Sequence, residues 1–451
     1  MMRCLWILLA FLSLSADAQI ILLHRGGAGN AAPVQNGAAA ALATANNNSL
    51  CTAISPFYAA ISNFSGSVNW STAVNVVLPG WVSSTAYSVG ARVSYGTSNY
   101  LALQASTNQL PTVTAYWKSL GAVYPATPMN SATGIGMASA SKFQYAAYVT
   151  AIRGGASNFT SADIAALNFT DGYTNMGSET AGSQCSTSAT YCATPVPNPS
   201  PAVNSVNNCL AICGINNPSQ PNSYQNPATI GVFNYDSGHQ ENHASANQST
   251  LGIANLATNQ IYLYYQGAFG QGTSSGLGVF TEPLLAGGIY QTPAHYLGFL
   301  NAFVNSATMM SILSPSYIAA NAVCAWLPGI GSGCGTCTGT NGCYSPISEK
   351  WDYVAGYWWE ADPSNGNDFS ISSPGAYGAY PFVMPLCPAA GHAGNLCTTS
   401  AEFTAAGSSP WVYYGMLAQF VPTGSSPTGN GQASGACMQK VRKAFLTGVQ
   451  Q

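Results

Sequence analysis

The sequence predicts an α+β fold, because helical and strand-like segments both occur along it. After Ser139, apolar side chains return every three to four residues until Gly154-Gly155 stops the pattern, as expected of a helix. The helical positions are Tyr145, Tyr148, Val149 and Ile152. Residues 81–120 instead alternate in the manner of strands, and residues 353–359 and 411–420 are apolar enough to be buried strands.

The first 18 residues have the features of a secretory signal peptide. Arg3 supplies a positive charge, Leu5–Leu14 is an apolar run, and Ala16-Asp17-Ala18 is a small-x-small cleavage site. The run is too short to span a bilayer and no later segment is long enough, so we expect a secreted or periplasmic protein without a membrane span. Charged residues make up 5% of the chain and the formal charge is -3, with no basic run, which argues against nucleic acid as a partner.

The chain has thirteen cysteines, and twelve remain when Cys4 is assigned to the signal peptide. An even number of cysteines in an exported protein indicates disulfides. Because these cysteines cluster in polar loops, we expect mostly short-range pairs such as Cys185–Cys192 and Cys387–Cys397. Cys334-Gly-Thr-Cys337 could be half of a zinc or redox site, but no second pair at zinc spacing exists, which favours a disulfide here too.

The helices outside the Ser139 segment are predicted from caps and apolar periodicity. Residues 19–79 contain an Ala-rich stretch and a predicted helix near Pro56–Phe64, and they form the start of a larger domain. A turn at Ser373-Pro374-Gly375 leads into a further strand. The remaining predicted helices are Ser161–Leu167, the helix opened by Thr292-Pro293, and Met438–Leu446.

Residues 80–121 match a spaced pattern, W-x5-Y-x2-G-x2-V-x-Y-x4-Y…P-x5-W, carried by Trp81, Tyr87, Gly90, Val93, Tyr95, Tyr100, Pro111 and Trp117. The segment resembles the small carbohydrate-binding modules first seen on chitinases. The resemblance implies a polysaccharide partner, bound by ring stacking on Trp81, Tyr100, Tyr116 and Trp117. These modules usually have a tryptophan just before the proline, where this chain has Asn108-Gln109-Leu110. The alternative is therefore a structural insertion whose aromatic residues form its own small core.

Ser139-x-x-Lys142 is the candidate catalytic pair. Three residues apart on a helix, the two side chains share a face, and a nearby amine can accept the proton of a nucleophilic serine. A serine at a helix start also offers its own backbone N–H to a developing oxyanion. Because S-x-x-K also arises by chance, the pair needs the support of other motifs.

Four further motifs follow in an order that resembles the serine β-lactamase and penicillin-binding-protein superfamily, in particular its class C-like branch of esterases and amide hydrolases. The five motifs are Met137–Lys142, Leu167–Gly172, Tyr235, Ala286–Thr292 and Pro374–Gly378. The resemblance implies one hydrolase domain made of residues 19–79 and 122–451, interrupted by the insert at 80–121. It also implies an antiparallel sheet flanked by helices, a helical subdomain, and a site in the cleft between them.

By this resemblance Ser139 is the acylated nucleophile, Lys142 its proton partner, and Tyr235 the group that shuttles protons to the leaving group and from water. The implied oxyanion and substrate-binding positions are Ser139, Ser237, Ser373, Gly375 and Ala376, the last through its backbone N–H.

Two departures from the family pattern bear on the substrate. Ser237 replaces the asparagine of Y-x-N, and Ser373-Pro374 replaces the Lys/His-Thr pair of the third motif. The cation that commonly binds a β-lactam or peptide carboxylate is thereby lost. We therefore expect an esterase or amidase acting on a small-molecule ester or amide, with little β-lactamase activity.

Two other patterns suggest different chemistry. Gly272–Gly276 satisfies G-x-S-x-G, but strand-like residues follow it where α/β-hydrolases need a helix. His239-Gln-Glu241-Asn-His243 resembles a zincin helix with its glutamate displaced by one position, so the histidines are predicted to be cap or packing residues, and no metal or cofactor is expected. The non-enzyme alternative is an extracellular carbohydrate- or surface-binding protein on the same scaffold. The altered third motif, Ser373-Pro374, favours this alternative. The presence of all three candidate catalytic residues, Ser139, Lys142 and Tyr235, argues against it.

Overall fold

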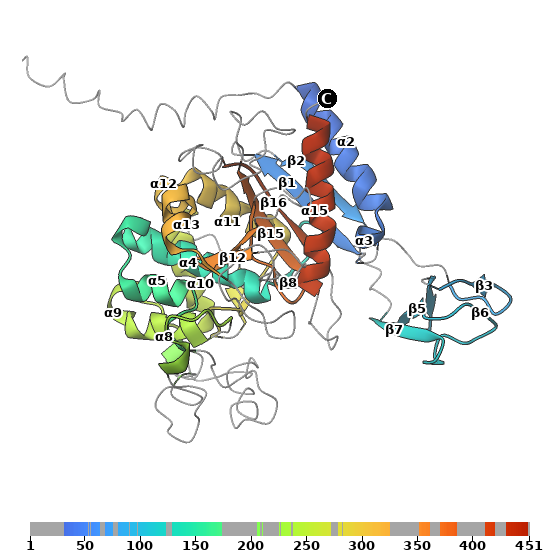
Figure 1. The fold of residues 1–451 in the computed structure, drawn as a ribbon, viewed down its shortest axis with the longest axis horizontal. Coiled ribbons are helices and arrows are strands. Elements are labelled where there is room, and N and C mark those ends of the chain that lie inside the picture. Colours follow the sequence, from blue (N-terminus) through green and yellow to red (C-terminus); the bar gives the residue numbers. More distant parts are fainter. Residues whose placement is uncertain are drawn as a thin grey trace, which may run out of the picture.

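The computed structural model of the chain combines helices with antiparallel sheets. It describes residues 31–52, 54, 56–63, 68–74, 80–89, 91–96, 98–122, 129–173, 205–207, 210, 225, 227–235, 238–271, 278–281, 283–324, 351–360, 370–385, 411–419 and 430–449. Figure 1 shows the arrangement of these elements. The mixed helix-and-strand class that the sequence predicts is present.

An eight-stranded antiparallel sheet lies at the centre of the main body, in the order β11-β12-β13-β14-β15-β16-β1-β2. Its strands are β1 (Phe57–Asn63), β2 (Val68–Val74), β11 (Val323–Cys324), β12 (Trp351–Val354), β13 (Tyr357–Glu360), β14 (Ser370–Ser372), β15 (Ala379–Pro385) and β16 (Trp411–Gln419). Strand β1 pairs with β16 along its full length, so the N-terminal strands complete a sheet otherwise built from the C-terminal third of the chain.

Strand β1 corrects the helix predicted near Pro56–Phe64. Its side chains alternate between two hydrophobic cores, with Tyr58 and Ala60 in one and Phe57, Ala59 and Ile61 in the other. Because both faces of β1 are covered, the segment is apolar nearly throughout and shows no polar alternation. A short apolar run of this kind cannot be distinguished from a buried helix by periodicity.

A hairpin corrects the single strand predicted at residues 353–359. Strands β12 and β13 pair antiparallel, and Ala355 and Gly356 connect them with φ angles of 46° and 79°. Two consecutive positive φ angles are the geometry of a tight hairpin turn. The flanking residues are buried on both sides of that turn, so the apolar run gives no sign of the reversal.

Two long helices, α2 (Ala31–Asn47) and α15 (Asn430–Val449), lie side by side against one face of the sheet (Figure 1). Helix α15 contains the predicted segment Met438–Leu446. A disulfide joins Cys51 of the short helix α3 (Ser49–Thr52) to Cys437 of α15, across 386 residues of sequence. The short-range pairs Cys185–Cys192 and Cys387–Cys397 lie outside the described residues.

The remaining described helices lie on the side of the other face of the sheet, where some of them share a hydrophobic core with its strands. They are η1 (Ala138–Ala140), α4 (Ser141–Arg153), η2 (Ala156–Asn158), α5 (Ser161–Leu167), η5 (Pro227–Thr229), α8 (Gly238–Ala246), α9 (Gln248–Leu251), α10 (Thr258–Ala268), α11 (Pro293–Asn305), α12 (Ala307–Met310), η6 (Ser311–Leu313) and α13 (Pro315–Asn321). Helix α4 lies in their core, where Phe143 packs edge-on against Phe299, Phe303 and Tyr357. The predicted caps are confirmed: Gly154 ends α4 at a φ of 76°, and Thr292 caps α11.

A small three-stranded sheet leads into the Ser139 turn. It consists of β8 (Ile135–Gly136), β10 (Ile289–Gln291) and β9 (Val279–Phe280), in the order β8-β10-β9. The backbone N–H of Met137 donates to the carbonyl of Ile289 at 2.7 Å, which extends the β8–β10 pairing up to the turn.

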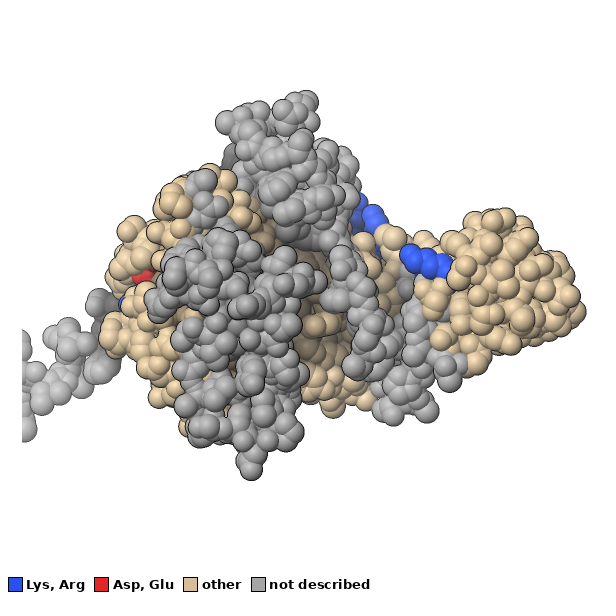
Figure 2. Space-filling model, turned by 90° about the horizontal axis from the view of Figure 1, so that it is seen from below, with Lys and Arg blue, Asp and Glu red and all other residues tan. Residues whose placement is uncertain are grey.

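The surface is poor in charge. Figure 2 shows a face on which the described residues are mostly uncharged, with few blue and red side chains among the tan, in keeping with a charged content of 5%. In the described part of the chain, no single helix has both the length and the hydropathy needed to cross a membrane. The bent pair Pro293–Asn305 and Ala307–Leu313, with 83° between its two arms, meets those criteria only when both helices are taken together.

Residues 80–122 form a small β structure with its own core. Strands β4 (Arg92–Tyr95), β5 (Ser98–Ala102) and β7 (Trp117–Ala122) make one sheet, while β3 (Ala86–Tyr87) pairs with β6 (Ser106–Thr107); Figure 1 shows them grouped together. Its core consists of Val93, Ala102 and Trp117, with Trp81, Tyr87, Ala91, Tyr100 and Tyr116 packed against them.

Within this module the sugar-stacking role predicted for Trp117 is wrong. Trp117 is 1% exposed, its indole N–H donates to the carbonyl of Gln109 at 2.9 Å, and Tyr87 packs against it at 5.3 Å. Its ring faces are therefore covered by protein. Trp81, Tyr100 and Tyr116 are half-buried, and polysaccharide binding through them stays a prediction.

Candidate active site

Ser139 lies in the turn between β8 and α4, and this turn has an unusual backbone. Ala138, the residue before Ser139, has a φ of 45°, in the left-handed region that residues with a Cβ seldom adopt. Such strain is found where the surrounding structure fixes a functional geometry. Ser139 itself is half-buried, whereas Ala138, Ala140 and Ser141 are buried. Ser139 is therefore more exposed to solvent than the residues on either side of it in the turn.

Lys142 and Ser139 are in contact, as the spacing predicts. The Lys142 ammonium lies 3.1 Å from Ser139 Oγ and donates a second hydrogen bond of 3.1 Å to the carbonyl oxygen of Ala286. Lys142 is 5% exposed, and within the described part of the chain no carboxylate lies at ion-pair distance from it. A buried amine whose hydrogen bonds within the described residues go to a hydroxyl and a carbonyl is arranged for proton transfer rather than for a salt bridge.

Tyr235 also lies at Lys142, and it does so through its ring. The Lys142 Nζ is 4.8 Å from the centre of the Tyr235 ring and 5.9 Å from that of Phe169. Aromatic faces attract cations. Tyr235 packs in turn against Phe233, Tyr353 and Trp358, an aromatic cluster that fixes its ring. The structure thus brings Tyr235 to the Ser139–Lys142 pair, from which it is distant in sequence.

The third motif packs directly on the Ser139 turn. Ser373 is buried, and its hydroxyl donates to the carbonyl oxygen of Ser139 at 3.0 Å. Gly375 approaches so closely that a Cβ there would stand 2.0 Å from the carbonyl oxygen of Met137. The third motif therefore supports the backbone that carries Ser139.

This geometry corrects two of the predicted oxyanion and substrate contacts. The Ser373 hydroxyl is bound to the Ser139 carbonyl, and the Gly375 N–H donates to the carbonyl of Ala379 at 2.7 Å, so neither group is directed at a substrate. Ala376 is half-exposed beside them, and its N–H remains the predicted second oxyanion donor. Ser237 lies outside the described residues, as does the G-x-S-x-G segment 272–276.

His239 holds the loop that carries Tyr235. One ring nitrogen contacts the carboxyl group of Asp171, and the other lies 2.8 Å from the carbonyl of Asn234, the residue before Tyr235. Carboxylate and carbonyl oxygens both accept hydrogen bonds, so both ring nitrogens of His239 face acceptor groups. Phe169 stacks on the imidazole with ring centres 4.8 Å apart. His239 is thus a packing residue, as predicted, and it fixes the position of Tyr235.

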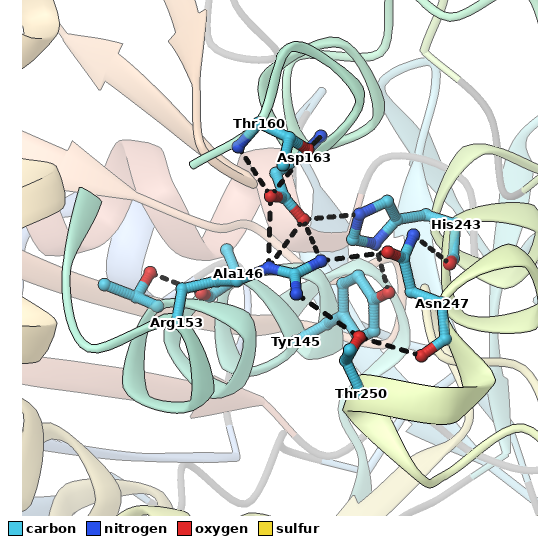
Figure 3. Close-up of polar contacts among 9 residues, drawn as sticks. Tyr145, Ala146, Arg153, Thr160, Asp163, His243, Asn247 and Thr250 are labelled. Atoms are coloured by element: carbon cyan, nitrogen blue, oxygen red, sulfur yellow. Dashed lines mark hydrogen bonds and ion pairs between the residues drawn. The ribbon is translucent and has the colours of Figure 1, made fainter. Parts of the chain in front are cut away.

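His243 belongs to a second buried network at the far end of α4, which Figure 3 shows. Asp163 accepts hydrogen bonds from both Nε and Nη2 of Arg153, and from Nε2 of His243 at 2.8 Å. Burial by itself would raise the pKa of the Asp163 carboxyl, but the hydrogen bonds from His243, Arg153 and Thr160 outweigh it and hold that pKa well below its ordinary value. Asp163 is therefore ionised.

The protonation of His243 follows from its neighbours. Since Asp163 is ionised, Nε2 of His243 carries a proton, and Nδ1 can accept from the hydroxyl of Tyr145 at 2.7 Å. Burial, with Glu241 and Asp163 nearby, raises the pKa of Tyr145 well above its ordinary value, so this phenol stays a donor. The hydrogen bonds from Tyr145 to His243 and from His243 to Asp163 thus pair the facing groups of all three side chains. Within the described residues, no group of three or more metal-binding side chains is found here or elsewhere.

The sequence analysis missed a buried glutamate at the site. Glu241 of α8 is fully buried, and its Oε1 accepts a 2.9 Å hydrogen bond from the N–H of Ala286, the residue whose carbonyl holds Lys142. The signal was available as a run of polar residues, Gly238–Ala244, in a helix that is buried along that whole length. Polar groups in such a helix need partners inside the protein.

Two exposed tyrosines flank the approach to Ser139. Tyr290 is 44% exposed and lies over Gly134, and Tyr377 is 45% exposed and lies over Gly136. Tyr290 pairs across the small sheet with Gly136 on one side and with the exposed Val279 on the other. Exposed aromatic side chains thus lie at β8, the strand that precedes Ser139.

No known family model matches this chain, and no curated protein has a significantly similar sequence. Function must therefore be argued from the site itself. The described groups provide a serine hydroxyl, a buried amine in contact with it, a tyrosine ring over the amine, and a strained turn that can direct a backbone N–H. These are the components of acyl transfer through a covalent intermediate.

Proposed function

We propose that this protein is an exported serine hydrolase, related to the serine β-lactamase superfamily, that cleaves an uncharged ester or amide through an acyl-enzyme. The observation that carries the proposal is the 3.1 Å contact between Lys142 Nζ and Ser139 Oγ, made by a buried amine without a carboxylate partner in the described residues. A lysine kept only for stability would be expected to meet an anion, as buried charges generally do.

In the proposed reaction Lys142, once its ammonium has released a proton, takes the proton from Ser139 Oγ while the oxygen attacks the substrate carbonyl. The oxyanion is stabilised by the backbone N–H groups of Ser139 and Ala376. As the intermediate collapses, the leaving group departs with a proton delivered by way of Lys142 and Tyr235, and the acyl group remains on Ser139. A water molecule then attacks the acyl-serine ester and passes a proton through the same groups to Ser139 Oγ. The bond between the acyl carbon and that oxygen breaks, the acid leaves, and the serine is restored.

Two features favour an uncharged substrate over a β-lactam. The third motif has no cation, and its serine hydroxyl already binds the Ser139 carbonyl. Three exposed residues at the small sheet that leads into the Ser139 turn, Tyr290, Tyr377 and Val279, are uncharged. Losing a charge-assisted hydrogen bond to a carboxylate costs about 1.5–3 kcal/mol of binding, which an uncharged ester does not experience.

The test compares short-chain p-nitrophenyl esters with a chromogenic cephalosporin, on wild type and on Ser139→Ala. We expect ester turnover by wild type that falls to background in Ser139→Ala, covalent labelling of Ser139 by a phosphonate, and slow cephalosporin hydrolysis. Turnover that survives Ser139→Ala would refute the nucleophile. Absence of both turnover and labelling would favour the non-catalytic binding alternative, and efficient cephalosporin hydrolysis would refute the argument on substrate charge.

A further inference from the structure

Glu241 is a buried acid that the proposed reaction does not use directly. Burying a carboxyl group is costly unless it is hydrogen-bonded. Its Oε1 accepts from the N–H of Ala286, in the turn between β9 and β10, at 2.9 Å. The next polar group along that backbone is the Ala286 carbonyl, which receives the hydrogen bond from Lys142 Nζ.

The turn is fixed on its other side by the small sheet. The N–H groups of Gly287 and Gly288 both donate to the carbonyl of Leu284, and Ile289 then pairs with the start of the Ser139 turn. On the side facing α8, Glu241 holds Ala286 from within the protein. The position of the Lys142 acceptor therefore depends on α8 as well as on the sheet.

Helix α8 also contacts the backbone of Lys142. Gln240 Nε2 donates to the carbonyl of Lys142 at 3.2 Å, one residue before Glu241 in the chain. Consecutive residues of one helix thus hold the backbone of Lys142 and the residue that binds its ammonium. His239, the second residue of the same helix, holds the Tyr235 loop.

We infer that Glu241 is the positioning residue for the proton-transfer lysine: by accepting the Ala286 N–H it places the Ala286 carbonyl that holds Lys142 Nζ against Ser139 Oγ. Glu241 acts on the reaction only through Lys142, and it does so as a hydrogen-bond acceptor. This inference rests on the proposed serine hydrolase function. It predicts that replacing Glu241 lowers the reaction rate when Lys142 is present and has no effect on that rate when Lys142 is absent.

The experiment is a double-mutant cycle between Glu241→Leu and Lys142→Ala, read by ester turnover and by the rate of Ser139 labelling with a small phosphonate. A misplacement of about 1 Å can cost about a hundredfold in rate. We therefore expect Glu241→Leu to lower kcat and the labelling rate by about ten- to a hundredfold, with KM nearly unchanged. Glu241→Gln should stay within a few-fold of wild type, because its amide oxygen accepts the same N–H. In the Lys142→Ala background Glu241→Leu should cause no further loss.

The matched control is Asn242→Ala, which removes a buried hydrogen bond within the same helix, from Asn242 Nδ2 to the carbonyl of Gly238. It should leave the labelling rate unchanged. If Glu241→Leu does not fold, Glu241→Asp, one methylene shorter with its charge retained, should show the loss that Glu241→Gln does not. Equal losses with and without Lys142, or a loss in Asn242→Ala as large as in Glu241→Leu, would overturn the inference while leaving the hydrolase proposal intact. Turnover that survives Ser139→Ala would instead overturn both.

Discussion

The two ends of α4 each carry a largely buried cation, and the surroundings of the two cations differ. Arg153, at the C-terminal end, donates to both oxygens of Asp163 and also reaches Asn247 and Thr250. Lys142, at the N-terminal end, meets the Ser139 hydroxyl, the Ala286 carbonyl and the faces of two aromatic rings. One cation is neutralised by a carboxylate, and the other stands against a candidate nucleophile.

The difference separates a stabilising arrangement from a reactive one. A bidentate arginine–carboxylate pair with further hydrogen bonds compensates the cost of burying charge. Lys142 has no anion within the described residues, so part of the cost of burying it is not compensated there. Natural proteins keep such groups where activity requires them. Disrupting each site should therefore have different consequences: a lower rate of ester turnover at Lys142, and a lower free energy of unfolding at Arg153.

Lys142→Met is expected to have the largest effect of the changes considered. Methionine fills a similar volume without a proton-accepting group, so ester turnover should fall by about 10²- to 10⁴-fold, the range of general acid–base catalysis. The free energy of unfolding should stay the same or rise, because a buried charge is removed. Steady-state kinetics and urea unfolding measure the two quantities.

The control is Lys440→Met on α15, where the side chain is exposed and neither quantity should change. A Lys142→Met variant that is several kcal/mol less stable than wild type would contradict the comparison, since Lys142 would then have a structural role like that of Arg153.

Asp163→Ala is expected to have the next largest effect, and to act on stability. It leaves Arg153 and His243 buried without their anion and removes the carboxylate that accepts from the backbone of Thr160. Breaking a buried ion pair from one side costs about 3–5 kcal/mol. Urea unfolding should show that loss, while ester turnover per folded molecule stays near wild type. A rate loss without a stability loss would place Asp163 in the catalytic machinery.

The comparison also shows what could be predicted from sequence. The Ser139–Lys142 contact follows from three-residue spacing at a helix start, and the caps at Gly154 and Thr292 follow from their residue types. These features are local, so a short stretch of sequence contains the whole cause. The same holds for α5, where Thr160 and Asp163 form a reciprocal capping box.

The rest depends on contacts between distant segments. Asp163 and His243 are separated by 80 residues and Glu241 and Ala286 by 45, and no local pattern specifies those pairs. The helix predicted at residues 56–64 failed for a similar reason, because the covering of β1 on both faces is decided by α2 and α15 on one side and by the helices around α4 on the other.

The depressed pKa of Asp163 gives the comparison a pH dependence. A carboxyl whose folded pKa lies below its unfolded value, about 4, adds stability that is fully present above the unfolded pKa and is lost as pH falls toward the folded one. The free energy of unfolding of wild type, measured with urea, should therefore decrease as the pH falls from 6 to 3. Asp163→Asn should be less stable at pH 6 and show a smaller decline. Parallel declines in the two proteins would assign the acid sensitivity to other carboxylates.

Thr250→Ala is expected to have the smallest effect, and it tests how far the saturation of Arg153 extends. Thr250 Oγ1 accepts from Arg153 Nη1 at 3.2 Å from an exposed position, where water can replace it, so the loss should be about 0.5 kcal/mol or less. Asn247→Ala should cost more, about 1–2 kcal/mol, because Asn247 accepts from Nη2 at 2.9 Å and also donates to the carbonyl of His243. Ester turnover should be unchanged in both. Small, graded losses of stability at a constant turnover rate are expected for a cation with several hydrogen-bond acceptors, because the remaining acceptors compensate for the one removed.

At Lys142 each contact has a separate part in placing the amine. The corresponding changes there should therefore appear in the turnover rate.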